Sequence, residues 1–346
     1  MSLAIASLPM AALATLFAVA AVIVWWAGTR LTSYVDAVAQ RFGLGQAFAG
    51  MVLLGGITSL PEFAAVSTAS LNGNASLAVN NLLGSAAVNV LLLVLADVAF
   101  GRGALTRAAA QPGTLMQGVL GMMLLSAVAG VVLWGDFAVV GVGVGVGAGT
   151  VGVAVACLLA MRISSGFERR DVWRRTEEDG PGPKVEDSDP RSTGRLLLGL
   201  TLLGAVILAA GAMLSLSADG IAEQAGLSSG MVGFLLVAFA TSLPELSSIT
   251  AAVRAKRYEL AVGDIFGTNL FNLVLLLVVD LLSPDRPVLA AAGTFEVLGA
   301  LVALMMTGAF VVGLLERRNR TLLRMGYDAV AALVIFIMGV AAMATV

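Results

Sequence analysis

Histidine is absent from this chain of 346 residues, and cysteine occurs only once, as Cys157. These absences exclude metal sites built from His and Cys, a disulfide framework and catalysis by a Cys–His pair. Charged residues make up only 12% of the chain, and its net charge of -2 comes with no basic patch that would bind a nucleic acid. Any metal ion bound here must therefore be held by oxygen atoms, and no cofactor is predicted.

Apolar residues dominate the chain, with 59% hydrophobic residues and 40 glycines, a composition typical of a membrane protein. A hydrocarbon core of ~30 Å requires about 20 apolar residues in a helix. The first apolar stretch is long enough to span the membrane, which distinguishes it from a cleaved signal. The sequence predicts an all-α polytopic membrane protein with ten transmembrane helices, over residues 8–28, 46–70, 76–100, 112–134, 137–161, 195–217, 228–253, 258–282, 289–315 and 325–345.

Positive charge is distributed unevenly about these spans. Nineteen of the 20 Lys and Arg residues fall on one side, and only Arg286 falls on the other. By the positive-inside rule, both termini lie outside and the central loop is cytoplasmic, in a plasma or inner membrane. Residues 162–194 are charged and poor in apolar side chains, and are interpreted as a linker between two five-helix halves, 1–161 and 195–346. The acidic run at 187–189 lacks the ligand spacing of an EF-hand.

The chain contains an internal repeat. A shift of 183 positions aligns residues 58–97 with residues 241–280 without a gap, and 14 of the 40 pairs are identical. Each copy occupies the second and third spans of a half with an odd number of spans, so the two copies enter the membrane from opposite sides. The link at 254–257 carries three basic residues and its counterpart at 71–75 carries none, which agrees with inversion. The sequence thus predicts two inverted five-helix repeats, as in many secondary transporters.

Both copies begin with Thr-Ser-Leu-Pro-Glu, set inside an apolar span. A carboxylate in the hydrocarbon region costs roughly 2.5–3.5 kcal/mol, and a proline removes a helical hydrogen bond. We expect Pro61 to break its helix and to free carbonyl groups near Thr58, one turn before Glu62. The second copy repeats this arrangement at Thr241, Pro244 and Glu245. Because no Lys or Arg occurs deep in any span, the pattern predicts two carboxylates available to a cation.

Polar side chains then follow one face of the next helix in each copy: Asn81, Ser85 and Asn89 in the first, and Asp264, Thr268 and Asn272 in the second. Together the two copies predict a central site of Glu62, Asn81, Glu245 and Asp264, with oxygens of Thr58 and Thr241 nearby. Such an oxygen site suits Ca²⁺ or several Na⁺, and the empty site is expected to bind protons because close carboxylates repel. Ser85, Thr268, Asn89 and Asn272 fit equally well as packing contacts between helices.

Other polar or small residues are interpreted as structural. The glycines at 141, 143, 145, 147 and 149 are expected to pack helices closely through positions 141, 145 and 149. Asp97 and Asp280 lie at helix ends near Arg102 and Arg286, and are expected to be solvated or paired at the surface. Glu296 and Asp328 also lie near span ends and are assigned no role.

The two Thr-Ser-Leu-Pro-Glu copies, each followed by a Gly-Ser-Asn-like motif that starts at Gly84 or Gly267, resemble the α-repeats of the cation/calcium exchanger superfamily, particularly its sodium/calcium exchangers. The resemblance covers both repeats and the layout of five plus five helices. It implies that the first and sixth helices form a mobile gating pair. It also implies central ion ligands at Glu62 and Glu245, flanking ligands at Asn81 and Asp264, oxygens or shape from Thr58, Thr241, Ser59 and Ser242, and carbonyls at Gly55 and Ala238 for outer Na⁺ positions.

The chain departs from that family pattern in ways that bear on the counter-ion. Ala86 replaces the Asn of the first motif, whereas Asn269 is kept in the second. Leu77 and Leu260 stand where sodium-coupled relatives can carry Ser, and this loss weakens outer Na⁺ sites. The calcium/proton branch carries a Gly-Asn-Ala-x-Glu-like signature that this chain lacks. The predicted function is exchange of Ca²⁺ for Na⁺ by alternating access at one shared site in the lipid bilayer; the alternative is a Ca²⁺/H⁺ or other cation/H⁺ antiporter.

Two other classes of protein share single features with this sequence. Val262-Gly263-Asp264 is similar to the Gly-x-Gly-Asp motif of intramembrane aspartyl proteases, but position 261 is Ala and the hypothesis leaves the Pro-Glu pairs unexplained. A cation channel would use similar oxygens, and voltage-driven current without exchange would distinguish it. No enzymatic activity and no protein partner are predicted.

Overall fold

The computed structural model describes residues 5, 8–41, 55–100, 104–138, 145–167, 191–254, 256, 258–283, 287–317, 321–322 and 325–346. These residues are mostly helical, and the described part contains one short hairpin, of β1 (Thr321–Leu322) and β2 (Met325–Gly326). Within the described ranges, six helices are long and apolar enough to cross a bilayer: α2 (Met10–Arg41), α6 (Ala75–Phe100), α8 (Pro112–Trp134), α10 (Thr193–Ala225), α14 (Tyr258–Leu282) and α16 (Thr294–Glu316). The predicted class, an all-α polytopic membrane protein, is confirmed.

The remaining apolar segments are shorter or broken. One span is formed by α11 (Ser229–Val232), the π-helix η2 (Gly233–Val237), α12 (Ala238–Thr241) and α13 (Leu243–Arg254), with a bend of 45° before α13. A second broken helix consists of α4 (Gly55–Thr58) and α5 (Leu60–Leu71), and its predicted beginning at 46–54 lies outside the described residues. Two shorter apolar helices are α9 (Ala148–Phe167) and α17 (Tyr327–Met343), and α7 (Leu105–Ala109) and α15 (Val288–Ala291) are short connectors. The count of ten spans stays a prediction.

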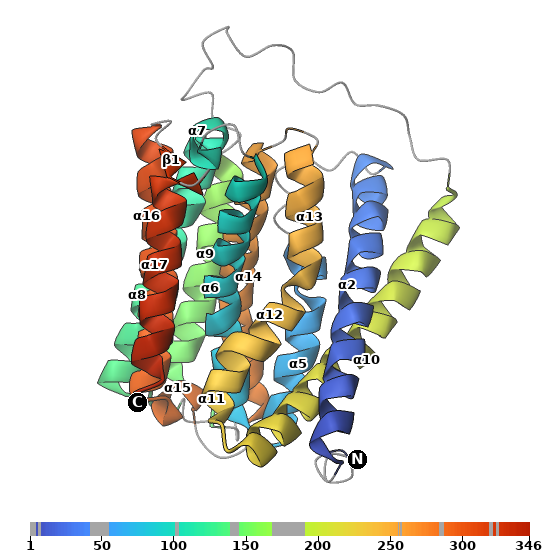
Figure 1. The fold of residues 1–346 in the computed structure, drawn as a ribbon, viewed down its shortest axis with the longest axis vertical. Helices are drawn as coiled ribbons and strands as arrows, with labels where there is room; N and C mark the ends of the chain where they lie inside the picture. The colour runs from blue at the N-terminus through green and yellow to red at the C-terminus, as the bar shows by residue number, and fades with distance from the viewer. Residues whose placement is uncertain are drawn as a thin grey trace, which may run out of the picture.

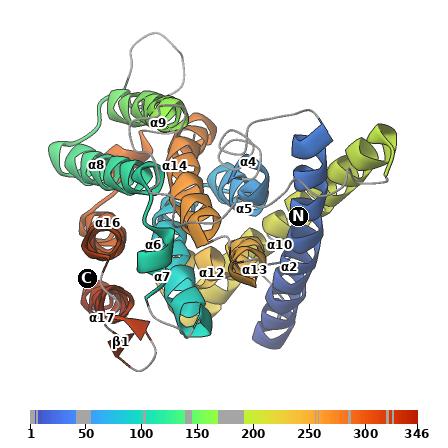
Figure 2. The ribbon, with the colours of Figure 1, turned by 90° about the horizontal axis from the view of Figure 1, so that it is seen from above.

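The helices form a central group with helices on two sides. Seen from above, α5, α6, α12, α13 and α14 lie in the middle, with α2 and α10 on one side and α8, α9, α16 and α17 on the other (Figure 2). Within the central group, α5 lies in the lower half of the molecule and α13 in the upper half (Figure 1). The two broken helices therefore run away from the centre in opposite directions, the arrangement expected of an inverted repeat.

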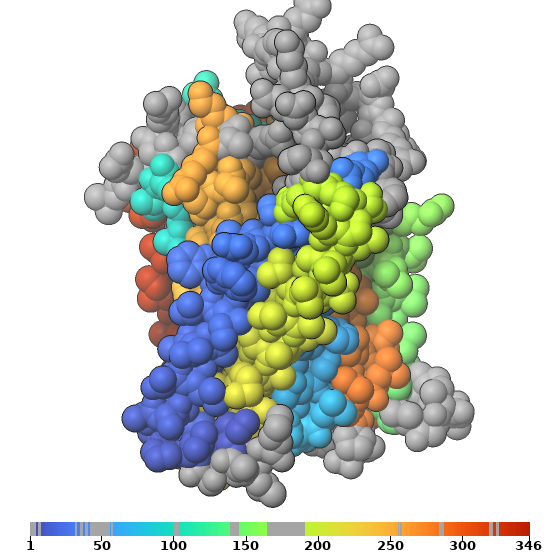
Figure 3. All heavy atoms as spheres, turned by 90° about the vertical axis from the view of Figure 1, so that its right-hand side faces the viewer, coloured from blue at the N-terminus to red at the C-terminus, as the bar shows by residue number. Residues whose placement is uncertain are grey.

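The outer pair, α2 and α10, packs side by side and rests on the broken helices (Figure 3). A Cβ atom added to Gly28 of α2 would lie 2.5 Å from Pro244, and one added to Gly211 of α10 would lie 2.8 Å from the carbonyl oxygen of Pro61. Gly28 and Gly211 are separated by 183 positions, the offset of the repeat. Only glycine permits these close contacts, so the structural correspondence extends beyond the aligned segments.

Hydrogen bonds connect α2 to α13, the helix of the second repeat that carries Glu245. Trp25 Nε1 donates to Ser247 Oγ at 2.7 Å, and Thr29 Oγ1 lies 2.7 Å from the same oxygen. The corresponding residue of the first repeat is Ala64, whose Cβ packs against α10 at Gly211 and offers no hydroxyl group. The contact of α2 with the second repeat is thus polar, whereas this contact of α10 with the first is apolar.

The glycine ladder agrees with the prediction of close packing only at Gly149, where an added Cβ would clash with the side chain of Val131 of α8. Gly141 and Gly143 lie outside the described residues, and α9 begins at Ala148 although a span was predicted from 137. Gly145 precedes the helix, so the prediction that it packs within a helix was wrong. Each glycine disfavours a helix by about 1 kcal/mol relative to alanine. The backbone here is bound by carboxylates, because Gly147 N donates to Asp280 at 2.6 Å and Gly149 N donates to Asp136 at 2.7 Å.

The charged linker lies mostly outside the described residues. Of the linker predicted at 162–194, residues 168–190 are not described. On either side, α9 continues to Phe167 and α10 begins at Thr193, where Ser192 caps the helix by accepting from the backbone N–H of Arg195. The division into two five-helix halves stays a prediction.

Candidate ion-binding site

The two Thr-Ser-Leu-Pro-Glu segments break their helices at the same place. In both copies the serine between threonine and leucine leaves the helix, with φ -78° and ψ 6° at Ser59 and φ -83° and ψ 6° at Ser242. Each proline lies in the first turn of the helix that follows, where its missing N–H costs least. The predicted breaks are confirmed, and each places a helix amino terminus in the interior of the molecule.

Glu62 and Glu245 lie in the first turns of α5 and α13, where the helix dipole favours negative charge. Both side chains are completely buried, with 0% exposure. Among the described residues, none forms a well-aligned hydrogen bond to an oxygen of either carboxylate. Glu62 and Asp264 are nonetheless close enough for their charges to act on Glu245. The structure therefore brings the predicted carboxylates together without a basic partner among the residues it describes.

Hydroxyl groups of both repeats surround the carboxylates. Thr241, Ser242 and Ser85 have their hydroxyls near Glu62, and Thr58 has its hydroxyl near Glu245. Each glutamate thus faces the threonine of the opposite copy. The four predicted hydroxyl residues, Thr58, Ser59, Thr241 and Ser242, are all buried. This crossed arrangement makes the two motifs parts of one site.

The flanking positions on α6 and α14 are also buried beside the motifs. Asn81 Oδ1 accepts a hydrogen bond from Thr241 Oγ1 at 3.4 Å, and Ser85 Oγ lies 3.5 Å from the same Thr241 oxygen. Asp264 Oδ2 accepts from the hydroxyl of Ser248 on α13. Ser248 was not predicted, although its position three residues after Glu245 places it on the same helix face.

Gly55 and Ala238 are the two residues whose carbonyl groups were predicted to face outer Na⁺ positions, and the structure describes their surroundings only in part. Gly55 begins α4, and its surroundings lie outside the description. Ala238 is buried at the start of α12, and its carbonyl oxygen accepts from Thr241 Oγ1 at 3.3 Å and from Ser242 N at 3.1 Å. Their role toward an ion stays a prediction.

Farther along α6 and α14, the polar residues link the two helices unequally. Asn269 accepts from Asn89 Nδ2 at 2.9 Å and donates to the carbonyl oxygen of Ala86 at 3.1 Å. The reciprocal bond, from Asn272 to a side chain at position 86, is impossible because that residue is alanine. Asn272 is fully buried, and its amide has no hydrogen-bond partner among the described residues. Asn89 is therefore a packing contact between α6 and α14, and the choice between packing and a place in the ion site stays a prediction for Thr268 and Asn272.

Asp97 and Asp280 correct a prediction, because they are neither solvated nor at the surface. Asp97 is 1% exposed and accepts from Leu105 N and Gly326 N, while Asp280 is 0% exposed and accepts from Gly147 N and Val288 N. All four distances lie between 2.5 and 2.7 Å. Each aspartate thus accepts from backbone N–H groups at the amino-terminal ends of two other helices.

Glu296, which was assigned no role, also has a structural one. It accepts hydrogen bonds from Asn80 Nδ2 at 2.7 Å, Ser76 Oγ at 3.3 Å and Gly293 N at 2.8 Å. These contacts join the start of α16 to the start of α6, on the turn that carries Asn81. The carboxylate of Glu296 is thereby satisfied by hydrogen-bond donors, in contrast to those of Glu62 and Glu245.

The site offers only oxygen and amide groups to an ion. Among the described residues, no three acidic, His or Cys side chains gather closely enough to hold a metal by themselves. An ion here would therefore take hydroxyl, amide and backbone oxygens in addition to the carboxylates, as Ca²⁺ and Na⁺ commonly do. Broken helices, a buried set of carboxylates between inverted segments and an apolar exterior define a secondary transporter of cations.

Comparison with known proteins agrees with this class. The model of the family described as "Sodium/calcium exchanger protein" matches residues 12–162 and 195–344, and the chain belongs to that family. It is a transporter family, so the chain is not an enzyme. The inner membrane protein YrbG of Escherichia coli is 30% identical over 264 residues, covering 76% of this chain and 77% of that protein. A protein named as an antiporter, CaxA of Alkalimonas amylolytica, is 27% identical over 311 residues, covering 89% and 93%.

Among solved structures, the fold is similar to that of the sodium-calcium exchanger NCX_Mj soaked with Na⁺ and Sr²⁺. The TM-score is 0.62 at 18% identity, and the match covers 96% of this chain and 99% of that one. A second structure of that exchanger, soaked with Na⁺ and Ca²⁺, also gives a TM-score of 0.62, covering 95% and 97%. These similarities establish the fold.

Proposed function

We propose that the chain exchanges Ca²⁺ for Na⁺ by alternating access at one site in the membrane, with Glu62 and Glu245 as the central ligands. The observation that carries the proposal is the pair of fully buried carboxylates without a basic partner among the described residues. Burying a charge without compensation is costly, so the two carboxylates need a bound cation when they are ionised. The names of CaxA and NCX_Mj, an antiporter and a sodium-calcium exchanger, support this assignment.

Coupling follows from the shared ligands. Because Ca²⁺ and Na⁺ use the same two carboxylates, binding of one excludes the other. Only neutralised, occupied forms of the site cross between the inward-open and outward-open states, because an ionised site without a cation carries uncompensated negative charge that hinders passage through an occluded state. Asn81, Asp264 and the hydroxyls of Thr58 and Thr241 complete the coordination. Opening and closing would use α2 and α10, which rest on the broken helices through glycine contacts.

A second candidate counter-ion is H⁺. Leu77 is buried at 1% exposure and Leu260 is 38% exposed, so neither position supplies the hydroxyl that an outer Na⁺ site uses in sodium-coupled relatives. Carboxylates accept protons as well as cations, and a Ca²⁺/H⁺ exchanger would need no such hydroxyl. This observation concerns the counter-ion alone and leaves the Ca²⁺ site unaffected.

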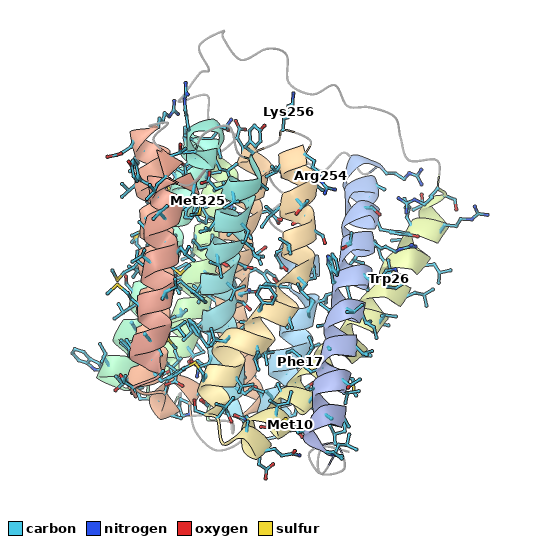
Figure 4. All side chains as sticks on the ribbon, in the orientation of Figure 1. Met10, Phe17, Trp26, Arg254, Lys256 and Met325 are labelled. Atoms are coloured by element: carbon cyan, nitrogen blue, oxygen red, sulfur yellow. The ribbon has the colours of Figure 1, made fainter. Side chains whose placement is uncertain are left out.

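The proposed orientation places both termini outside and the central loop in the cytoplasm. Arg254 and Lys256 lie at one end of the molecule and Met10 at the other (Figure 4). Cysteine substitutions at Met10 and Lys256 offer a direct test, because the only native cysteine, Cys157, is buried. In intact cells, an impermeant maleimide should label the Met10 variant and spare the Lys256 variant; the reverse pattern would invert the topology.

The experiment for the function is Ca²⁺ uptake by sealed proteoliposomes under an outward Na⁺ gradient, an outward H⁺ gradient, both and neither. We expect uptake to follow the Na⁺ gradient and to vanish when both gradients are absent. Uptake driven by the H⁺ gradient alone would establish the proton-coupled alternative. Ca²⁺ movement that follows membrane voltage in the absence of either gradient would indicate a channel.

A further inference from the structure

Ser248 occupies a position between the two acidic residues of the second repeat. It lies on α13 one turn after Glu245, is 8% exposed, and its Oγ is hydrogen bonded to Oδ2 of Asp264 on α14. The same Oγ lies 3.0 Å from the carbonyl oxygen of Glu245. A hydroxyl group has one proton to donate, and an ionised carboxylate is the stronger acceptor. The hydroxyl therefore connects Asp264 to the helix that carries Glu245.

The first repeat lacks this connection. The residue corresponding to Ser248 is Ala65, and the residue corresponding to Asp264 is Asn81. An amide carries its own donors and accepts from Thr241, whereas a carboxylate has none and requires a donor when it is buried. The hydroxyl of Ser248 thus occurs in the second repeat, which is also the repeat that carries a carboxylate, Asp264, at this position. A carboxylate needs such a donor to be held in a fixed orientation, and Ser248 supplies it to Asp264.

We propose that Ser248 is a positioning residue for ion binding: it fixes the carboxylate of Asp264 beside Glu245, so that the site is ready for a divalent ion. The inference rests on the proposed Ca²⁺ transport and deepens it. With one oxygen held by Ser248, the carboxylate has a defined orientation toward the ion. Without the hydroxyl, the group rotates toward other donors and the ion loses a prearranged ligand.

The test is the Michaelis constant for Ca²⁺ uptake into proteoliposomes containing Ser248→Ala. We expect it to rise about tenfold, the effect of losing one hydrogen bond to a charged group, while the maximal rate changes less than about threefold. Ser248→Thr, which keeps a hydroxyl, should restore most of the affinity. Ser70→Ala is the matched control, because Ser70 is a buried serine of α5 whose hydroxyl donates to the Val66 carbonyl at 2.8 Å. Its Michaelis constant should stay unchanged.

A second background separates positioning from a general structural role. Asp264→Asn combined with Ser248→Ala reproduces the Asn81 and Ala65 pair of the first repeat. If Ser248 acts through the carboxylate, its removal should have no further effect in the Asp264→Asn background. Thermal unfolding of each variant in detergent reports whether it is folded.

The outcomes distinguish this inference from the proposed function. Wild-type protein that moves no Ca²⁺ refutes the function itself. Wild-type transport together with an unchanged Michaelis constant in folded Ser248→Ala overturns the role of Ser248 and leaves the function standing. The same holds if Ser248→Thr behaves like Ser248→Ala, or if Ser248→Ala weakens Ca²⁺ affinity equally in the Asp264→Asn background.

Discussion

Glu62→Gln and Glu245→Gln are the most informative changes, because each removes one charge at nearly constant side-chain volume. Both glutamates are completely buried and occupy corresponding positions of the repeat. In the Ca²⁺-bound site each carboxylate is the partner of a buried cation, and removing one partner of a buried pair of opposite charges costs about 3–5 kcal/mol. At 1.4 kcal/mol per tenfold, either variant should bind Ca²⁺ about a hundred to several thousand times more weakly than the wild type. At micromolar Ca²⁺ this amounts to loss of transport.

The assay is uptake of radioactive Ca²⁺ by proteoliposomes loaded with Na⁺, over a wide range of Ca²⁺ concentrations. Glu223→Gln serves as the control, because Glu223 is an exposed carboxylate of α10 and its loss should leave uptake unchanged. Both glutamine variants should be as thermally stable as the wild type or more so, since each removes an uncompensated buried charge. Uptake near wild-type levels by either folded variant would refute the reasoning.

Three further variants test separate contacts. Ser247→Ala removes the oxygen that fastens α2 to α13, and hydrogen exchange in the middle of α2 should accelerate; unchanged exchange would refute the fastening. Asp280→Asn weakens the hold on two backbone N–H groups, and the free energy of unfolding in detergent should fall by about 1–3 kcal/mol; an unchanged melting temperature would contradict this anchoring role. Ala86→Asn supplies a partner for the buried amide of Asn272 and should raise the melting temperature, whereas a lower one would show that position 86 cannot accept the side chain.

The broken helices could be predicted because proline acts locally. Pro61 and Pro244 cannot donate a backbone hydrogen bond, and the structure breaks both helices within two residues of them. Burial of Glu62 and Glu245 could be predicted from the apolar residues around them. The length of the apolar stretches also placed α8 and α14 with the limits found in the structure.

Contacts between helices could not be predicted from the apolar pattern of the sequence. The bond from Ser248 to Asp264 depends on the angle between α13 and α14, which a single sequence does not specify. Asp97 and Asp280 were assigned to the surface because they are charged and lie near span ends. The two aspartates instead accept hydrogen bonds from backbone groups, and some of these groups are far away in sequence, such as Gly326 N, which donates to Asp97. The π-helix at 233–237 likewise has no distinct sequence pattern.

The effect of Ala86 could be predicted in part from the sequence. The sequence showed that the first motif lacks the Asn that Asn269 supplies in the second. Only the structure showed that Asn269 reaches across to residue 86, which leaves Asn272 without a reciprocal partner among the described residues. Alignment of the two repeats identifies such differences between the copies, and the contacts between α6 and α14 determine their effect.

The central claim is that Glu62 and Glu245 form one site shared by Ca²⁺ and its counter-ion. Equilibrium dialysis of the purified protein against radioactive Ca²⁺, with increasing Na⁺ at constant pH and in a second series with decreasing pH in the absence of Na⁺, measures this directly. The proposed site predicts one Ca²⁺ per chain, displaced competitively by Na⁺, and no such binding by the Glu62→Gln, Glu245→Gln double variant. Ca²⁺ binding that persists in the double variant, or that Na⁺ and H⁺ both leave unchanged, would contradict it.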